Sequence, residues 1–191
     1  MYRLAIILLL LAAAHGGSRA QEHAFSVSPL LSYDRFHTLG FTSGIDFGAQ
    51  LIVATSPNLR IALEGLVASR DVPFDLVQGT QVLQATIFAY GCSVELPFLG
   101  HDGGSEVAAT MGAGGATSKV DARVVSLGAL GSITVPARTD SRGFVQAGLL
   151  GTFPLSSLLD IVVYPAYRLF LPLSRLAADL SIAGGLRVRI F

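Results

Sequence analysis

The stretch that decides the fold is Asp179-Leu180-Ser181-Ile182-Ala183-Gly184-Gly185-Leu186-Arg187-Val188-Arg189-Ile190-Phe191. From residue 180 to residue 190, every second residue is Leu, Ile, Gly or Val, and the residues between them are Ser, Ala, Gly or Arg. This period of two is typical of a β-strand with one apolar face and one polar face. A strand of this kind that runs directly into an aromatic residue is unusual in a soluble domain.

The same alternation recurs along the chain, most clearly in two segments around a short turn. In residues 39–51 most odd-numbered positions are apolar, whereas the even-numbered positions are Gly, Thr, Asp or Gln. In residues 60–68 Ile, Leu and Val alternate with Arg, Glu and Ala. Residues 55–58, Thr-Ser-Pro-Asn, are turn formers. We therefore expect a long β-hairpin here.

Nine segments are candidate strands, and they are separated by turn or loop segments, of which 70–81, 97–105 and 136–142 are the clearest. They are residues 24–34, 39–51, 60–68, 86–96, 106–116, 125–135, 145–153, 160–171 and 180–190. Segments of this length without a helical period predict an all-β, antiparallel up-and-down transmembrane β-barrel. A barrel with both ends in the periplasm needs an even number of strands. We expect eight, with ten as the alternative, so that either 24–34 or 106–116 is not an independent strand or a tenth strand is hidden.

The first residues have the layout of a secretory signal peptide. Met1-Tyr2-Arg3 is positively charged, residues 4–14 are apolar, and Ser18-Arg19-Ala20 places small residues at a cleavage site after Ala20. The apolar run is shorter than the roughly 20 residues that a spanning helix needs. We expect residues 1–20 to be cleaved and residues 21–191 to form one barrel domain.

Composition excludes several other classes of protein. The chain has 13 basic and 13 acidic residues, so no basic excess indicates nucleic-acid binding. Cys92 is the only cysteine, which rules out an internal disulfide and a cysteine-based metal site. The chain is 51% hydrophobic and 14% charged, which fits either a very apolar core or a barrel whose outer face meets lipid.

Polar residues gather on one face of nearly every predicted strand, together with many glycines. Glycines weaken a solvated strand but leave room in a narrow lumen, so we expect the polar face to point inward; the alternative is a soluble β-barrel or sandwich. The predicted lumen charge network is Asp46, Arg60, Glu64, Glu95, Arg168, Arg187 and Arg189. We expect Glu64, Asp46 and Glu95 to neutralise the arginines and plug the lumen, because unpaired charges there are costly. A narrow pore or ligand cavity is the alternative.

No residues form a recognisable catalytic, cofactor or metal site. His23, His37 and His101 fall in predicted tails or turns, where a solvated histidine is the usual explanation. His37 and Ser43 are close in sequence, yet no carboxylate completes a catalytic arrangement by spacing. We predict that the protein is not an enzyme and holds no cofactor.

The final strand resembles the C-terminal strand by which the barrel-assembly machinery recognises outer-membrane proteins. The residues that carry this resemblance are Gly184, Leu186, Val188, Ile190 and Phe191. In its pattern the chain is similar to the small bacterial outer-membrane β-barrel proteins, which include the OmpA-like, OmpX-like and OmpW-like barrels. The resemblance implies a monomeric barrel in the outer membrane of a Gram-negative bacterium, surrounded by lipid and delivered by periplasmic chaperones and the assembly machinery.

The resemblance also implies a structural, interaction or uptake role. We expect a structural or interaction barrel. The alternatives are a small-molecule channel or uptake barrel, a lipid-modifying enzyme at the rim, and a soluble lipocalin-like binder.

Overall fold

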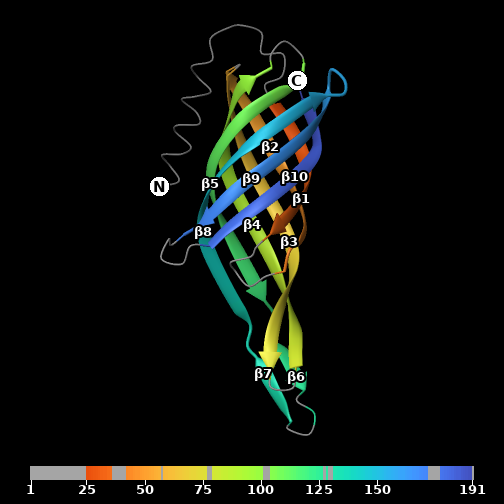
Figure 1. The fold of residues 1–191 in the computed structure, drawn as a ribbon, viewed down its shortest axis with the longest axis vertical. Helices are drawn as coiled ribbons and strands as arrows, with labels where there is room; N and C mark the ends of the chain where they lie inside the picture. The colour runs from red at the N-terminus through yellow and green to blue at the C-terminus, as the bar shows by residue number, and fades with distance from the viewer. Residues whose placement is uncertain are drawn as a thin grey trace.

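The computed structural model describes residues 25–35, 42–56, 58–76, 79–100, 104–126, 128, 131–171 and 177–190. These residues form ten strands: β1 (Phe25–Arg35), β2 (Gly44–Ser56), β3 (Leu59–Leu76), β4 (Gly79–Leu99), β5 (Glu106–Val120), β6 (Arg123–Ser126), β7 (Ser132–Val135), β8 (Arg138–Pro154), β9 (Leu159–Phe170) and β10 (Ala177–Ile190). Eight of them close into a barrel in the order β1-β10-β9-β8-β5-β4-β3-β2 (Figure 1). No helix in the described part of the chain is long and apolar enough to cross a membrane.

The barrel wall has eight strands, as the sequence predicts, but the surplus ninth segment is not the expected one. Residues 125–135 contribute to a separate two-stranded hairpin, β6–β7, that lies outside the ring between β5 and β8. Gly128 and Gly131 in its turn have φ angles of 64° and 96°, a backbone region that favours glycine. The expectation that 24–34 or 106–116 is not an independent strand is wrong, because both β1 and β5 belong to the wall.

Strand β5 has a weak apolar pattern because neighbouring side chains fill the space above its glycines. A Cβ atom added to Gly114 would lie 2.6 Å from the Cζ of Phe144 on β8 and 2.1 Å from the carbonyl oxygen of Tyr90 on β4. On the outer face, the ring of Tyr90 covers Gly115, where an added Cβ would lie 2.8 Å from the tyrosine hydroxyl. The glycines therefore let the adjacent strands approach closely, which a hydrophobicity pattern does not register.

The four strands β3, β4, β5 and β8 continue well beyond the rest of the wall. The sequence predicts a loop at residues 70–81, but β3 and β4 remain paired from Arg70↔Ala85 to Leu76↔Gly79. Strand β8 also begins at Arg138, inside the predicted turn at 136–142, and β4 runs to Leu99, inside the predicted turn at 97–105. The extension and the β6–β7 hairpin project from the end of the barrel opposite to Ile190 (Figure 1).

The outer face of the barrel is apolar on all sides. Every wall strand exposes at least one large apolar side chain, for example Leu31, Phe47, Leu63, Phe88, Met111, Leu149, Val163 and Leu186. Val188 and Ile190 on the last strand also point outward, as the sequence predicts. A continuous exposed apolar surface of this extent is typical of a protein that contacts lipid.

Aromatic side chains mark the two edges of this apolar face. On β1, exposed Phe25 and Tyr33 are eight residues apart, and on β4, exposed Phe98 and Tyr90 have the same separation. Eight residues of strand span about 26 Å, which is roughly 20 Å across a membrane at a tilt of about 40°. The phenylalanines lie towards the end that carries Phe25 and Ile190, here called the termini end, and the tyrosines lie towards the opposite, loop end.

Two prolines interrupt the ladders on either side of the β9–β10 pair. Between β1 and β10 the register runs from Val27↔Val188 to Leu30↔Gly185 without the two intervening pairs, and Pro29 lies in this gap. Between β8 and β9 the pairs from Gly148↔Ala166 to Gly151↔Val163 are interrupted in the same way at Pro165. Proline lacks the backbone N–H that a ladder requires. The β9–β10 pair is thus bounded by two weakened seams.

Candidate functional site: the lumen charge network

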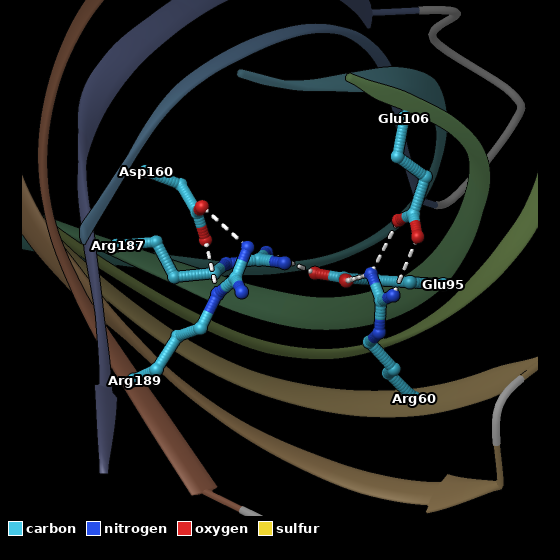
Figure 2. A network of polar contacts seen from close by, with 6 residues as sticks. All are labelled: Arg60, Glu95, Glu106, Asp160, Arg187 and Arg189. Carbon is cyan, nitrogen blue, oxygen red and sulfur yellow. Dashed lines mark hydrogen bonds and ion pairs between the residues drawn. The ribbon is translucent and has the colours of Figure 1, made fainter. Parts of the chain in front are cut away.

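The width of the lumen is bridged by a single ion pair. Arg187 on β10 donates from Nη2 to Oε1 of Glu95 on β4 at 2.9 Å, and both side chains are almost fully buried. Three strands separate β10 from β4 in either direction around the ring, so the two residues come from opposite sides of the wall. Figure 2 shows the pair reaching across the barrel interior.

Two further arginines flank this pair and complete what we call the termini-end network. Arg60 donates through both Nη atoms to the Glu106 carboxylate at 2.5 and 2.7 Å, and it lies 3.8 Å from Glu95. Arg189 donates to both oxygens of Asp160 at 2.9 and 2.5 Å. The termini-end network therefore contains Arg60, Glu95, Glu106, Asp160, Arg187 and Arg189, and its formal charges cancel (Figure 2).

A second set of polar side chains lies nearer the loop end. Arg168 on β9 donates to Asp34 on β1 at 3.2 Å and to Oε1 of Gln146 at 3.1 Å. Gln146 in turn donates to Glu64 at 2.7 Å, and Gln50 donates to the other oxygen of Glu64 at 3.3 Å. This chain of bonds links β9, β8, β3 and β2 through the centre of the barrel.

Arg70 fixes the entry to β2 at the loop end. It is buried, pairs with Asp46, and donates to the carbonyl oxygens of Gly44 and Ile45 at 3.2 Å each. These carbonyls belong to the first residues of β2, so one guanidinium both neutralises a buried carboxylate and satisfies exposed strand-end acceptors.

Apolar side chains fill the lumen between and beside the polar groups. One cluster at the loop end consists of Leu66, Ala68, Ile87, Ala89, Phe144 and Phe170. The rings of Phe144 and Phe170 pack edge to face at 5.8 Å, and the Arg168 guanidinium lies over Phe144 at 5.5 Å. A second cluster lines β1, β5, β8, β9 and β10 with Leu30, Ala108, Leu150, Val162, Tyr164, Ala166 and Ala183.

The seven residues of the predicted charge network all line the lumen, but several partners differ from those expected. Glu95 accepts from Arg187, whereas Glu64 accepts from two glutamines rather than from an arginine. The partners of Arg189, Arg168 and Asp46 are the unpredicted residues Asp160, Asp34 and Arg70. Asp34 continues the polar face of Ser26, Ser28 and Ser32, a signal that could have identified it. Arg70 was hidden in a segment interpreted as a loop.

Several predictions fall outside the described residues. These are the signal peptide, His23, His37, His101 and Phe191. The other residues of the predicted assembly signal lie on β10, where Leu186, Val188 and Ile190 are exposed on the outer face. In the described ranges, no group of three or more His, Cys, Asp and Glu side chains is arranged to hold a metal ion.

Comparison with solved structures assigns the fold. No protein-family model matches the chain, and no curated protein matches its sequence. A major outer membrane protein from Thermus thermophilus superimposes with a TM-score of 0.63 at 14% identity, over 88% of this chain and 100% of that one. This chain has the fold of the small outer-membrane β-barrels. The outer membrane protein OprG from Pseudomonas aeruginosa is also similar, with a TM-score of 0.53 at 6% identity over 87% of this chain and 95% of that one.

Proposed function

We propose that the protein is a monomeric integral barrel of the outer membrane with a structural or interaction role, and that paired charges plug its lumen. The observation that carries this proposal is the Arg187–Glu95 pair, which spans the lumen between opposite strands. An eight-stranded barrel has room only for its own side chains or one small ligand. Side chains that meet in the middle leave little space for a solute.

The outer surface supports the location and the monomeric state. Exposed apolar side chains surround the barrel on every wall strand, so lipid contacts the whole circumference. The aromatic bands at Phe25 and Tyr33 resemble the girdles that mark the two interfaces of a membrane. We propose that the termini end faces the periplasm, and that chaperones and the assembly machinery deliver the chain from that side.

The loop end supports an interaction role. The extension of β3, β4, β5 and β8 carries polar outward side chains, including Ser69, Thr86, Lys119 and Thr139, beyond the apolar band. The β6–β7 hairpin is tied to it, because Arg123 donates to the carbonyl oxygen of Val82 at 3.0 Å. A stiff polar sheet outside the bilayer is a suitable contact surface for other molecules at the cell surface.

Two measurements test the proposal. Cell fractionation with a heat-modifiable gel shift tests whether the chain is a folded outer-membrane barrel. Planar-bilayer recording tests the plug: we expect negligible steady conductance from the wild-type protein and a measurable conductance after combined Glu95→Ala and Arg187→Ala substitution. Steady conductance by the wild-type protein would instead support the small-molecule channel.

A further inference from the structure

Six buried polar atoms around the Arg187–Glu95 pair have no hydrogen-bond partner within the described protein. They are Ser28 Oγ, Gln50 Oε1, Ser93 Oγ, Glu95 Oε2, Thr152 Oγ1 and Arg187 Nε. Each belongs to a side chain that is at least nine-tenths buried. A buried polar atom without a partner is costly, so native proteins satisfy nearly all of them with protein groups or bound water.

The strand registers bring these atoms together in the termini-end half of the lumen. Ser93 lies two residues from Glu95 on the same inner face of β4. Ser28 follows Val27, which pairs with Val188, so Ser28 is level with Arg187 on the neighbouring strand. Thr152 pairs with Glu106 across β8 and β5, and is thus also beside the termini-end network.

The chemistry of the six atoms specifies their guest. Arg187 Nε can only donate, Glu95 Oε2 and Gln50 Oε1 only accept, and the three hydroxyls do both. The formal charges of the termini-end network cancel, so the guest carries no net charge. A small neutral molecule that both donates and accepts hydrogen bonds is water, and two to four polar partners per molecule are what a buried water requires.

The route for exchange is at the termini end. The side chains of Arg60, Glu106 and Arg189 are 20%, 14% and 26% exposed, so the mouth of the lumen is partly open to solvent there. Towards the loop end, two more orphaned atoms, Ser32 Oγ and Asp34 Oδ1, lie on β1. The facing wall is occupied by the apolar cluster of Leu66, Ala68, Ile87, Ala89, Phe144 and Phe170.

We infer that the lumen around Arg187 and Glu95 is a binding site for a cluster of ordered water molecules that exchange through the termini end. The barrel is then a hydrated pocket that is closed at the loop end. This inference rests on the proposed function, because a lumen that conducts solutes would be hydrated throughout. It adds that the plug is made by protein and water together.

Cysteine accessibility tests this inference. In a Cys92→Ala background, single Ser93→Cys and Ser28→Cys variants place a thiol at an orphaned hydroxyl, and Ala68→Cys and Ala89→Cys place one in the apolar cluster. The reagent is a small membrane-impermeant methanethiosulfonate ethylammonium, applied to the barrel refolded in phospholipid vesicles. We expect labelling at 93 and 28 to be about tenfold faster or more than at 68 and 89, because thiol reactivity follows access to solvent. Equal rates, or no labelling at any position, would overturn the inference.

Two additions keep the result clear. Arg189→Ala widens the termini end and is expected to speed labelling of Ser93→Cys, whereas Arg142→Ala at the loop end is expected to leave it unchanged; the reverse result contradicts the proposed route. If a cysteine variant does not show the heat-modifiable shift of a folded barrel, cross-relaxation between water and the amides of residues 93 and 89 in the wild-type protein replaces it. Failure to fractionate with the outer membrane would refute the proposed function, independently of the labelling.

Discussion

Arg187 and Glu95 are 92 positions apart in sequence and come from opposite sides of the barrel, yet their side chains meet at 2.9 Å. Both are almost fully buried, so removal of either leaves the other as an uncompensated charge in a low-dielectric interior. We expect Glu95→Ala or Arg187→Ala to lower the free energy of unfolding by about 3 kcal/mol. The double variant is expected to lose much less than the sum of the two. Reversible urea unfolding in detergent or lipid measures this coupling.

Two matched pairs serve as controls for this cycle. Arg142 and Asp140 also form an ion pair, but their side chains are 28% and 39% exposed, so their coupling should stay below about 1 kcal/mol. Glu64 and Arg187 do not bond to each other, and their losses should add. Strict additivity for Glu95 and Arg187 would contradict the plugged lumen.

Val163 tests the assignment of the outer face. It is exposed on β9, between Ile161, which pairs with Phe153 of one aromatic band, and Tyr167 of the other. We expect Val163→Arg to cost about 2–4 kcal/mol, because a charge near the middle of the bilayer loses its hydration. Thr139→Arg, at an exposed position on the extension, should change stability by less than about 0.5 kcal/mol. Equal tolerance of both substitutions would mean that the outer face does not contact lipid.

Gly114 tests the close packing of β5. An alanine there would place its Cβ 2.1 Å from the Tyr90 carbonyl oxygen and 2.6 Å from Phe144. We expect Gly114→Ala to destabilise the barrel by about 1–3 kcal/mol through overpacking. Gly65→Ala is the matched control, since nothing lies within 4 Å of its added Cβ, and it should be neutral or slightly stabilising. The two unfolding midpoints give the comparison, and a similar loss at both positions would refute the steric explanation.

Pro165 tests the weakened seam between β8 and β9. Pro165→Val supplies the backbone N–H that the ladder lacks at this point. We expect a gain of about 1 kcal/mol in stability, and slower amide hydrogen exchange at residues 148–151 and 163–166. Pro29→Val should have the same effect at the β1–β10 seam. Unchanged exchange at both seams would show that the missing pairs do not weaken the wall.

Period-two alternation was enough to predict the closed antiparallel barrel, because each strand separates lipid-facing from lumen-facing residues. It also placed Arg187, Glu95 and Glu64 on the inner face. It could not assign their partners, since these depend on how far each strand is shifted along its neighbour, and this shift accumulates around the ring. Glu64 therefore meets Gln146 of β8, although no local pattern relates them.

Other features escaped prediction for different physical reasons. The β6–β7 hairpin resembles a wall strand in composition, because Val124, Val125 and Ile133 are β-formers. The extension at residues 70–81 contains Pro73 and charges, which are turn signals in a buried strand but are tolerated in a sheet outside the bilayer. Strand β5 was undervalued because its glycines are packed by neighbouring chains rather than by their own side chains.

The pairing of β1 with β10 has a consequence for biosynthesis. Phe25 pairs with Ile190, so the first strand of the described chain finds one of its two neighbours only in the last. The ring cannot close while the chain is still being made, and until then both strands expose unpaired backbone edges together with apolar side chains. Contacts between such distant segments form slowly. Every copy must therefore pass through a long-lived, adhesive precursor, and the yield of barrels depends on how long that precursor is kept apart from others.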